Sequence, residues 1–289
     1  MTEVRSGDIL SKAMEVAGIS PNVFATLAHI EPDTLYRYCV DQKPIPEKVF
    51  RLLMEVLDLA EVDPISLLPL PKDQPCFFHT SSTLFSCPVD VTRNKGKRND
   101  FGHGFYLGEN LRQASSWGGK GGKTYIYVYP ASLLSNAKVL DLSKSPSWRW
   151  LSYIGFNRNK FSPIDFPRLS RALSHLADGY DVVKGKIADS FNFSILELMF
   201  LDQIDVDQAE MASIIIALGD QLCVKSPTLA QKLVPTEVFC FDETVCNYFR
   251  CYRQQGERKL HELTKEILSR SPCPERTFSA LLEKDNGFM

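Results

Sequence analysis

The sequence has no hydrophobic run approaching the roughly 18 apolar residues that a membrane-spanning helix requires. Its first residues, MTEVRSGDIL, lack the basic stretch followed by an apolar stretch that marks a secretory signal. It also lacks internal repeats and low-complexity tracts. These absences argue against membrane, fibrous and repeat proteins, so we expect a cytoplasmic protein with no membrane partner.

Metal-binding patterns are missing as well. The eight cysteines are scattered, with no Cys-x-x-Cys pair and no nearby paired histidines. Zinc sites usually show such spacings, whereas isolated cysteines in a reducing compartment behave as small buried apolar residues. We therefore expect no metal site.

What is present is typical of a globular protein. The chain has 289 residues, of which 44% are hydrophobic and 24% are charged, which suggests one or two domains. The net charge of −2 is unevenly distributed. Residues 1–70 carry six basic and eleven acidic side chains, whereas residues 91–125 carry seven basic and two acidic ones. The two regions are therefore expected to face different partners.

Residues 1–70 have the pattern of a small bundle of helices. Ser20-Pro21 and Glu31-Pro32 are helix starts, and "PEKVFRLLMEVLDL" places its apolar residues on one helical face. The segments "SPNVFATLAHI" and "EPDTLYRYCVDQK" resemble the helix-turn-helix domains of phage repressors, which commonly read DNA through the second helix. Only Arg37 and Lys43 lie near that helix, in an acidic region. This favours docking or dimerisation over DNA binding.

After a proline-rich linker at 67–75, the pattern changes to short strands mixed with helices. The sequence predicts strands at 76–81, 123–130, 137–143, 180–187, 220–226 and 237–242. It predicts helices at 109–118, 147–157, 166–178, 192–202, 206–218 and 227–233. We thus expect three parts: a helical domain at 1–70, an α+β domain at 76–243, and a helical C-terminal extension at 244–289.

Four segments carry a further resemblance. In chain order they are "FFHTSS", "DFGHGFYLGENLRQASSWG", "YDVVKGKIADSFNF" and "ALGDQLCVKSPTLAQKL". They are similar to the successive signature segments of an uncharacterised bacterial domain family placed among the ADP-ribosyltransferases, which also has a helix like "WRWLSYIGFNR". The resemblance covers about 76–242 and implies a split pair of small β-sheets surrounded by helices.

In that superfamily NAD binds between the two sheets, held by a histidine, a tyrosine and a third polar residue. The resemblance implies that His79 hydrogen-bonds the ribose and nicotinamide side, and that Tyr106 lays its ring against the nicotinamide. Gln221 would fix the ribose 2′-hydroxyl, although an amide cannot act as a base. Asp189 is the candidate catalytic carboxylate, with Asp220 or the acceptor itself as alternative sources of proton removal.

The resemblance implies further contacts to NAD. The glycines around "FGHGFY" would allow the backbone to approach the ligand closely. The basic loop "VTRNKGKRND" could meet the pyrophosphate of NAD or a nucleic-acid or acidic acceptor, and a solvated surface loop is the alternative. Asp100 is expected to hydrogen-bond the backbone of its own turn. The candidate cofactor-binding residues are His79, Thr80, Ser81, Gly104, Phe105, Tyr106, Trp117 and Arg98.

Some positions depart from the family pattern. The sequence has Thr80 where glycine is usual, Phe78 where tyrosine is usual, and a single acid, Asp189, where two consecutive acids are usual. An inactive copy is therefore an open alternative, as is a simple aromatic core role for Tyr106.

The leading hypothesis is an NAD-dependent ADP-ribosyltransferase that modifies a protein or nucleic-acid acceptor. It could serve as a bacterial toxin or effector in a toxin–antitoxin or defence system, with 1–70 docking an antitoxin or other partner. One alternative is an NAD glycohydrolase, in which water replaces the acceptor. Another is a non-enzymatic, nucleotide-sensing regulator that binds DNA.

Overall fold

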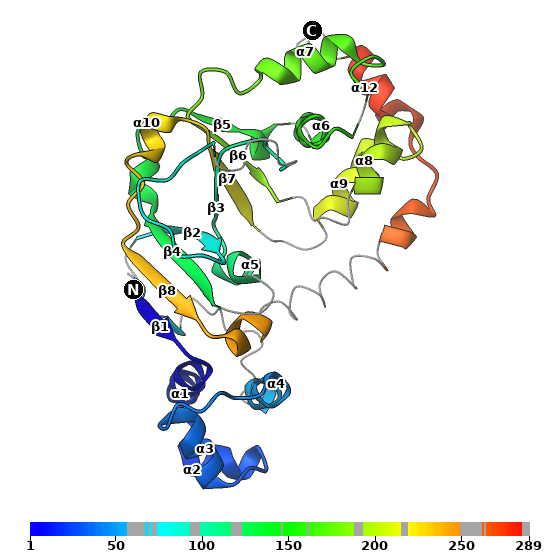
Figure 1. The fold of residues 1–289 in the computed structure, drawn as a ribbon. Coiled ribbons are helices and arrows are strands. Elements are labelled where there is room, and N and C mark those ends of the chain that lie inside the picture. The colour runs from blue at the N-terminus through cyan, green and yellow to red at the C-terminus, as the bar shows by residue number, and fades with distance from the viewer. Residues whose placement is uncertain are drawn as a thin grey trace. The chain divides into compact units, whose positions relative to one another are not determined.

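The computed structural model describes residues 1–56, 67–68, 70, 74–92, 99–116, 123–145, 147–160, 162–187, 193–214, 219–248, 262 and 264–284 (Figure 1). The contacts between residues divide the chain into two compact units. Unit 1 comprises 1–85, 110–131 and 235–254, and unit 2 comprises 86–109, 132–234 and 255–289. Each unit is thus assembled from three separate segments of the chain.

Unit 1 contains a mixed set of strands. Their order is β1 (Thr2–Val4), β8 (Glu237–Phe241), β4 (Thr124–Pro130) and β2 (Cys76–Ser81). β1 runs parallel to β8, and the other neighbouring pairs are antiparallel. The side chain of Asp242, directly after β8, accepts hydrogen bonds from the Ser6 backbone N–H at 2.6 Å and from the Ser6 hydroxyl at 2.9 Å. This contact joins the start of the first helix to the end of β8.

The helices of unit 1 are α1 (Ser6–Ala17), α2 (Pro21–Leu27), α3 (Pro32–Cys39), α4 (Glu47–Val56) and α5 (Leu111–Ser116). α2 begins as the sequence predicts, with the Ser20 hydroxyl accepting from the Val23 N–H at 3.4 Å and a proline in the first turn. Phe24 and Phe50 from the helices share one buried cluster with Val128 and Phe239 from the strands. The N-terminal helices therefore pack onto the strands of their own unit.

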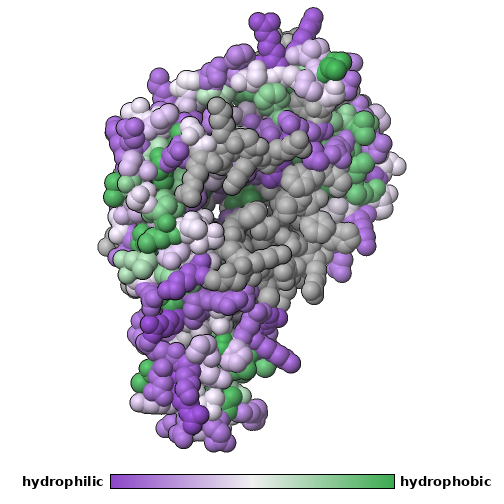
Figure 2. Space-filling model, viewed as in Figure 1, coloured by the Kyte–Doolittle hydropathy of each residue, from purple (hydrophilic) through white to green (hydrophobic). Residues whose placement is uncertain are grey.

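Large apolar side chains are also exposed on these N-terminal helices. In the view of Figure 2 the surface over them is mainly hydrophilic, with hydrophobic residues scattered across it. Scattered exposed apolar residues are ordinary on a protein surface. The exposed residues are Val16, Val23, Leu27, Tyr36, Val40, Leu52 and Val56.

Unit 2 has its own mixed set of strands. Their order is β3 (Phe105–Gly108), β7 (Asp220–Val224), β6 (Val182–Lys186) and β5 (Val139–Asp141), with β5 and β6 parallel and the other pairs antiparallel. Its α-helices are α6 (Ser147–Asn157), α7 (Pro167–His175), α8 (Phe193–Phe200), α9 (Val206–Ile214), α10 (Pro227–Ala230) and α12 (Phe278–Lys284). Short 3₁₀ helices lie at Ala131–Leu134, Leu142–Lys144 and Pro274–Arg276.

One face of these strands packs against α6. Trp150 and Ile154 of α6 lie in the same buried cluster as Val183 of β6 and Cys223 of β7. At Gly185 in β6, an added Cβ would lie 2.9 Å from the ring of Phe101, so a larger residue would not fit beneath the aromatic layer. Cys223 of β7, two residues from Gln221, is buried in the same cluster.

The described part of the C-terminal extension is divided between the units: residues 244–248 lie in unit 1, where Val245 and Cys246 are buried, and residues 264–284 lie in unit 2. Phe278 is fully buried, and its ring meets Phe166 and Phe200 edge-to-face with centroids 5.5 and 4.9 Å apart. Residues 264–284 therefore contribute Ile267 and Phe278 to the unit 2 core.

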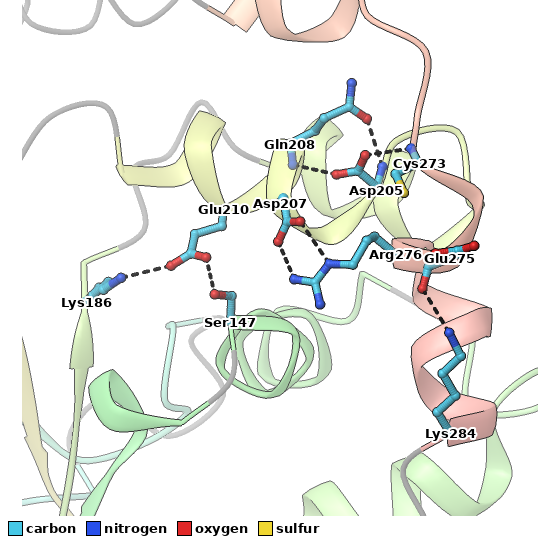
Figure 3. A network of polar contacts seen from close by, with 10 residues as sticks. All are labelled: Ser147, Lys186, Asp205, Asp207, Gln208, Glu210, Cys273, Glu275, Arg276 and Lys284. Carbon is cyan, nitrogen blue, oxygen red and sulfur yellow. Dashed lines mark hydrogen bonds and ion pairs between the residues drawn. The ribbon is translucent and has the colours of Figure 1, made fainter.

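Polar contacts around α9 reinforce this packing (Figure 3). Asp205 caps α9 by accepting from the Gln208 N–H at 2.8 Å, and its second oxygen accepts from the Cys273 N–H at 2.8 Å. Arg276 forms an ion pair with Asp207 in the first turn of the same helix. The start of α9 is thus tied to the C-terminal segment.

The coarse part of the fold prediction is confirmed. The fold class is α+β, and the strand at 76–81 and the helix at 147–157 have the predicted bounds. Two strands were not predicted. β1 lies in the region expected to be helical only, and β3 lies in the glycine-rich segment interpreted as a turn. No described helix has the length and apolar character needed to cross a membrane.

Candidate functional site

The segment "DFGHGFY" enters β3 through two glycines with positive φ. Gly102 has φ of +73° and Gly104 has φ of +151°, conformations that other residues rarely adopt. A Cβ at Gly104 would lie 2.7 Å from the carbonyl oxygen of Val224 and closer still to the Cys223 sulfur. The backbone at Gly104 therefore closely approaches β7, and its predicted approach to a ligand remains a prediction. From there Phe105 turns to a buried side and Tyr106 to the opposite side.

The hydroxyl of Tyr106 is tied to the turn that precedes it. It donates to the carbonyl of Gly102 at 2.7 Å and accepts from the N–H of Phe101 at 3.0 Å. Burial, with smaller contributions from Cys223 and Asp100, raises the pKa of the Tyr106 phenol well above its usual value. The phenol therefore stays neutral, and its ring is held in a fixed orientation rather than poised to donate or accept a proton.

Gln221 lies on the strand next to Tyr106. In the antiparallel register of β3 and β7, Tyr106 is opposite Cys223 and Gly108 is opposite Gln221. Directly opposed residues project to the same face of an antiparallel pair, and residues two apart on one strand share a face. Tyr106 and Gln221 therefore lie on one face of neighbouring strands, and both are half-buried.

A buried ion pair stands beside Gln221. The Gln221 side-chain amide donates to a carboxylate oxygen of Asp100, and the other oxygen of Asp100 pairs with the guanidinium of Arg158. Asp100 is 5% exposed and Arg158 is 8% exposed. A buried carboxylate needs both a counter-charge and hydrogen-bond donors. Arg158 and Gln221 supply these to Asp100.

Cys223 of β7 and Lys225, which directly follows β7, hold the glycine-rich turn from the other side. The Lys225 ammonium donates to the backbone carbonyls of Phe101 and His103, the latter at 2.8 Å. Burial lowers the pKa of Lys225. The Cys223 thiol lies 3.7 Å from the His103 carbonyl, and burial raises its pKa to about 11. The turn before Tyr106 is thus bound to β7 through charge and sulfur contacts.

The carboxylate of Asp220 is engaged elsewhere. Lys184 of β6 forms ion pairs with Glu109 at 2.7 Å and with Asp220 at 3.2 Å. Burial alone would lower the pKa of Lys184, but its hydrogen bonds to both carboxylates outweigh this and raise it. Lys184 is opposite Leu222 in the register, so it projects to the face opposite that of Gln221. Asp220 is therefore poorly placed to act as a base beside Gln221.

His79 lies in unit 1, on β2 opposite Tyr127 of β4. Its ring meets Phe85 edge-to-face with centroids 5.6 Å apart, and the Tyr127 ring is 6.2 Å away. Phe85 stacks on Tyr127 at 4.0 Å, and its N–H donates to the Tyr127 hydroxyl at 2.7 Å. The imidazole is half-buried in an aromatic setting on β2.

The two residues after His79 use their hydroxyls locally. Thr80 donates to the Ala114 carbonyl at 2.6 Å, which ties α5 to β2. Ser81 donates to the Thr83 carbonyl at 2.6 Å and accepts from the Thr83 N–H at 3.1 Å. Their predicted contacts to a cofactor remain predictions.

Comparison with known proteins gives one match. Residues 76–234 match the model of a family described as a protein of unknown function, DUF3990. The chain belongs to the DUF3990 family. No curated protein matches the chain, and no solved structure matches it either.

Within the DUF3990 segment, the predicted residues fall into three groups. Tyr106, Gln221, Gly104 and Phe105 lie on β3 and β7 or at the turn before β3, and the first two share a face. His79, Thr80 and Ser81 lie on β2 of unit 1. Arg98, Trp117 and Asp189 fall outside the described residues.

Sequence reasoning missed two residues that contribute to the candidate site. Arg158 directly follows α6, and Lys225 directly follows β7. The expectation for Asp100 did not include its contacts to Arg158 and Gln221. A buried acid needs a cation, so the arginine in an accompanying motif was a usable signal for this pairing.

A separate pocket of about 640 Å³ lies in unit 1. Its lining comes from the start of α1, the connection between α3 and α4, and the end of β8. None of the predicted site residues lines it. No group of three or more metal-ligating side chains occurs in the described part of the chain.

Proposed function

We propose that this DUF3990 protein is an NAD-dependent ADP-ribosyltransferase. The observation that carries the proposal is the shared face of Tyr106 and Gln221 on neighbouring strands. The four sequence segments resemble those of a family placed among the ADP-ribosyltransferases. This resemblance implies that both residues belong to one NAD site, although they are far apart in the sequence. Tyr106 also packs against the buried cluster of unit 2, so the alternative is a core role, and the substitutions below separate the two.

The residues of the site suit NAD. A neutral Tyr106 offers the electron-rich face of its ring to the cationic nicotinamide, and its bonds to Gly102 and Phe101 keep that ring in place. The amide of Gln221 has an oxygen that can accept from a ribose hydroxyl. For His79 the proposal keeps the role that the sequence resemblance implies, a hydrogen bond to the ribose and nicotinamide side of NAD.

Transfer of ADP-ribose mainly requires that the enzyme orient the ribose of NAD. Breaking the bond between nicotinamide and ribose develops positive charge on the sugar, and the enzyme must hold the sugar while an acceptor attacks from the opposite face. Gln221 cannot remove the acceptor's proton, and Asp220 is paired with Lys184. In the proposal the acceptor's proton is therefore removed by Asp189, or the acceptor loses it without a base from the protein.

Transfer of label from NAD tests the proposal. Purified protein is incubated with lysate and with NAD labelled in the adenylate part, and label is followed into protein, nucleic acid and free ADP-ribose. Label in a macromolecule supports transfer. Label only in free ADP-ribose supports the glycohydrolase alternative, and intact NAD refutes both.

Substitutions then separate the residue roles. We expect His79→Ala and Tyr106→Ala to abolish nicotinamide release and Gln221→Ala to reduce it strongly. His175→Ala and Tyr180→Ala are matched controls, because His175 and Tyr180 are exposed residues of unit 2. If Tyr106→Ala releases nicotinamide at the wild-type rate and unfolds at the wild-type temperature, the assignment of His79, Tyr106 and Gln221 to one NAD site is ruled out.

We further propose that the protein acts as a toxin or effector whose helices α1–α4 dock a partner protein. The acidic balance of residues 1–70 supports docking over DNA binding. Expression of the wild-type protein should arrest bacterial growth, and His79→Ala or Tyr106→Ala should relieve the arrest. The regulator alternative instead predicts salt-dependent operator binding, NAD binding and no nicotinamide release.

A further inference from the structure

We infer that Asp100 is a positioning residue that fixes the side-chain amide of Gln221, so that the amide oxygen is the group presented to ligand. The inference rests on the proposed function for its ligand, the ribose hydroxyl of NAD. It concerns a residue expected from sequence to bond only its own turn. Arg158 completes the arrangement by neutralising Asp100.

The orientation of the amide follows from the chemistry of its neighbour. An ionised carboxylate only accepts hydrogen bonds, so the Gln221 group that faces Asp100 must be its NH₂. Arg158 carries a permanent positive charge and pairs with Asp100 out of solvent. With its nitrogen committed to Asp100, the amide directs its oxygen away from that contact.

This arrangement explains the use of glutamine at position 221. Glutamate there would place two carboxylates side by side next to a single guanidinium, and like charges at such distance repel. Glutamine gives the buried carboxylate a donor and leaves an acceptor for the ligand. A site built this way favours ligands that donate, such as a ribose hydroxyl, over ligands that only accept.

Reversing the polarity of the pair tests the inference. In Asp100→Asn the new amide can keep an oxygen toward Arg158, which leaves its NH₂ facing Gln221. The Gln221 amide must then rotate and offer its oxygen inward and its NH₂ to the ligand. We expect the KM for NAD to rise roughly tenfold, the effect of about one lost hydrogen bond.

The double variant Asp100→Asn, Gln221→Glu should recover most of this loss. A carboxylate at 221 accepts from the new NH₂ with one oxygen and presents its other oxygen to the ligand. Gln221→Glu alone should weaken NAD binding at least as much as Asp100→Asn, since it adds the carboxylate without removing its neighbour. A purely structural role for Asp100 predicts no such rescue.

Asp207→Asn is the matched control. It makes the same chemical change in an exposed ion pair of the same unit, where Arg276 and Asp207 are about half exposed. Its KM for NAD should equal the wild-type value. A rise equal to that of Asp100→Asn would overturn the inference.

The ligand-free protein gives a second readout that does not depend on NAD. In ¹⁵N spectra of the wild type, the hydrogens of the Gln221 side-chain NH₂ should exchange slowly with water. Gln221→Glu has no such NH₂, so the resonance that disappears in this variant identifies the Gln221 signal. Fast exchange of that NH₂ in the wild type would refute the inference even if Asp100→Asn fails to fold.

The two proposals can fail separately. If the wild type neither binds nor cleaves NAD but the Gln221 NH₂ is protected, the proposed function fails and the positioning of the amide stands. If the wild type cleaves NAD and the double variant is no better than either single variant, the positioning role fails and the function stands.

Discussion

Gly104→Ala should destabilise the protein through two separate effects at one atom. With φ at +151°, residue 104 occupies backbone space that costs a non-glycine residue about 1–3 kcal/mol. The new Cβ would also lie 2.7 Å from the Val224 carbonyl oxygen and even nearer the Cys223 sulfur. Both atoms belong to the neighbouring strand, so relief requires β3 or β7 to move. Such overpacking typically costs about 1–3 kcal/mol more.

Gly179→Ala provides the matched control. Gly179 also has positive φ, +78°, but its added Cβ would meet nothing within 4 Å. Its replacement should therefore cost only the backbone strain of about 1–2 kcal/mol. Loss of flexibility in the unfolded chain affects both variants alike and cancels in the comparison.

Urea unfolding followed by far-ultraviolet circular dichroism measures both variants. The free energy of unfolding of Gly104→Ala should lie about 1–3 kcal/mol below that of Gly179→Ala. This difference is the contribution of overpacking. Equal losses within about 0.5 kcal/mol would mean that the strands do not approach at residue 104 as described. Nicotinamide release should fall in the same variant, because Tyr106 follows Gly104 by two residues.

Three further outcomes are expected. Burial raises the pKa of Cys223 to about 11 from an ordinary 9.0, so the stability that the neutral thiol contributes is complete below pH 9 and is lost as the pH rises to 11. Between these pH values the free energy of unfolding, measured with urea, should fall by about 2–3 kcal/mol less in Cys223→Ala than in the wild type, and an equal fall in both proteins would contradict the prediction. Arg158→Ala leaves Asp100 buried without its counter-charge and should cost about 3–5 kcal/mol, whereas a change below about 1 kcal/mol in the same assay would refute the buried pair. Asp205→Ala removes the cap of α9 and the acceptor of the Cys273 N–H, so we expect the free energy of unfolding to fall by about 1–2 kcal/mol and the Cys273 amide hydrogen to exchange faster. Unchanged exchange at Cys273 would show that its contact with Asp205 does not hold the C-terminal segment.

Local signals in the sequence predicted most of the elements. The alternating aromatic run at 123–130 and the apolar run at 76–81 became β4 and β2, and the Ser20-Pro21 start became α2. Each of these depends on residues close together in the chain. β1 could not be found this way, because three residues carry no periodicity and pairing with β8 depends on residues more than two hundred positions away. β3 was missed because its flanking glycines are also typical of a turn.

The candidate site divides in the same way. The sequence segments singled out Tyr106 and Gln221, and the register of β3 and β7 brings them to one face. The Asp100–Arg158 pair was not predicted, because its partners come from a turn and from the end of a helix, and no spacing rule joins them. The bonds of the Tyr106 hydroxyl to its own turn were equally unpredictable, since they depend on the positive φ of Gly102.

The three-segment construction of each unit has a consequence for synthesis on the ribosome. Unit 1 needs β8 beside β1 and β4, and unit 2 needs Phe278 between Phe166 and Phe200. Neither hydrophobic core can close until most of the polypeptide has emerged. A nascent chain stopped before residue 237 would hold the described strands of unit 2 yet lack a central strand of unit 1, and would be a target for chaperones and proteases.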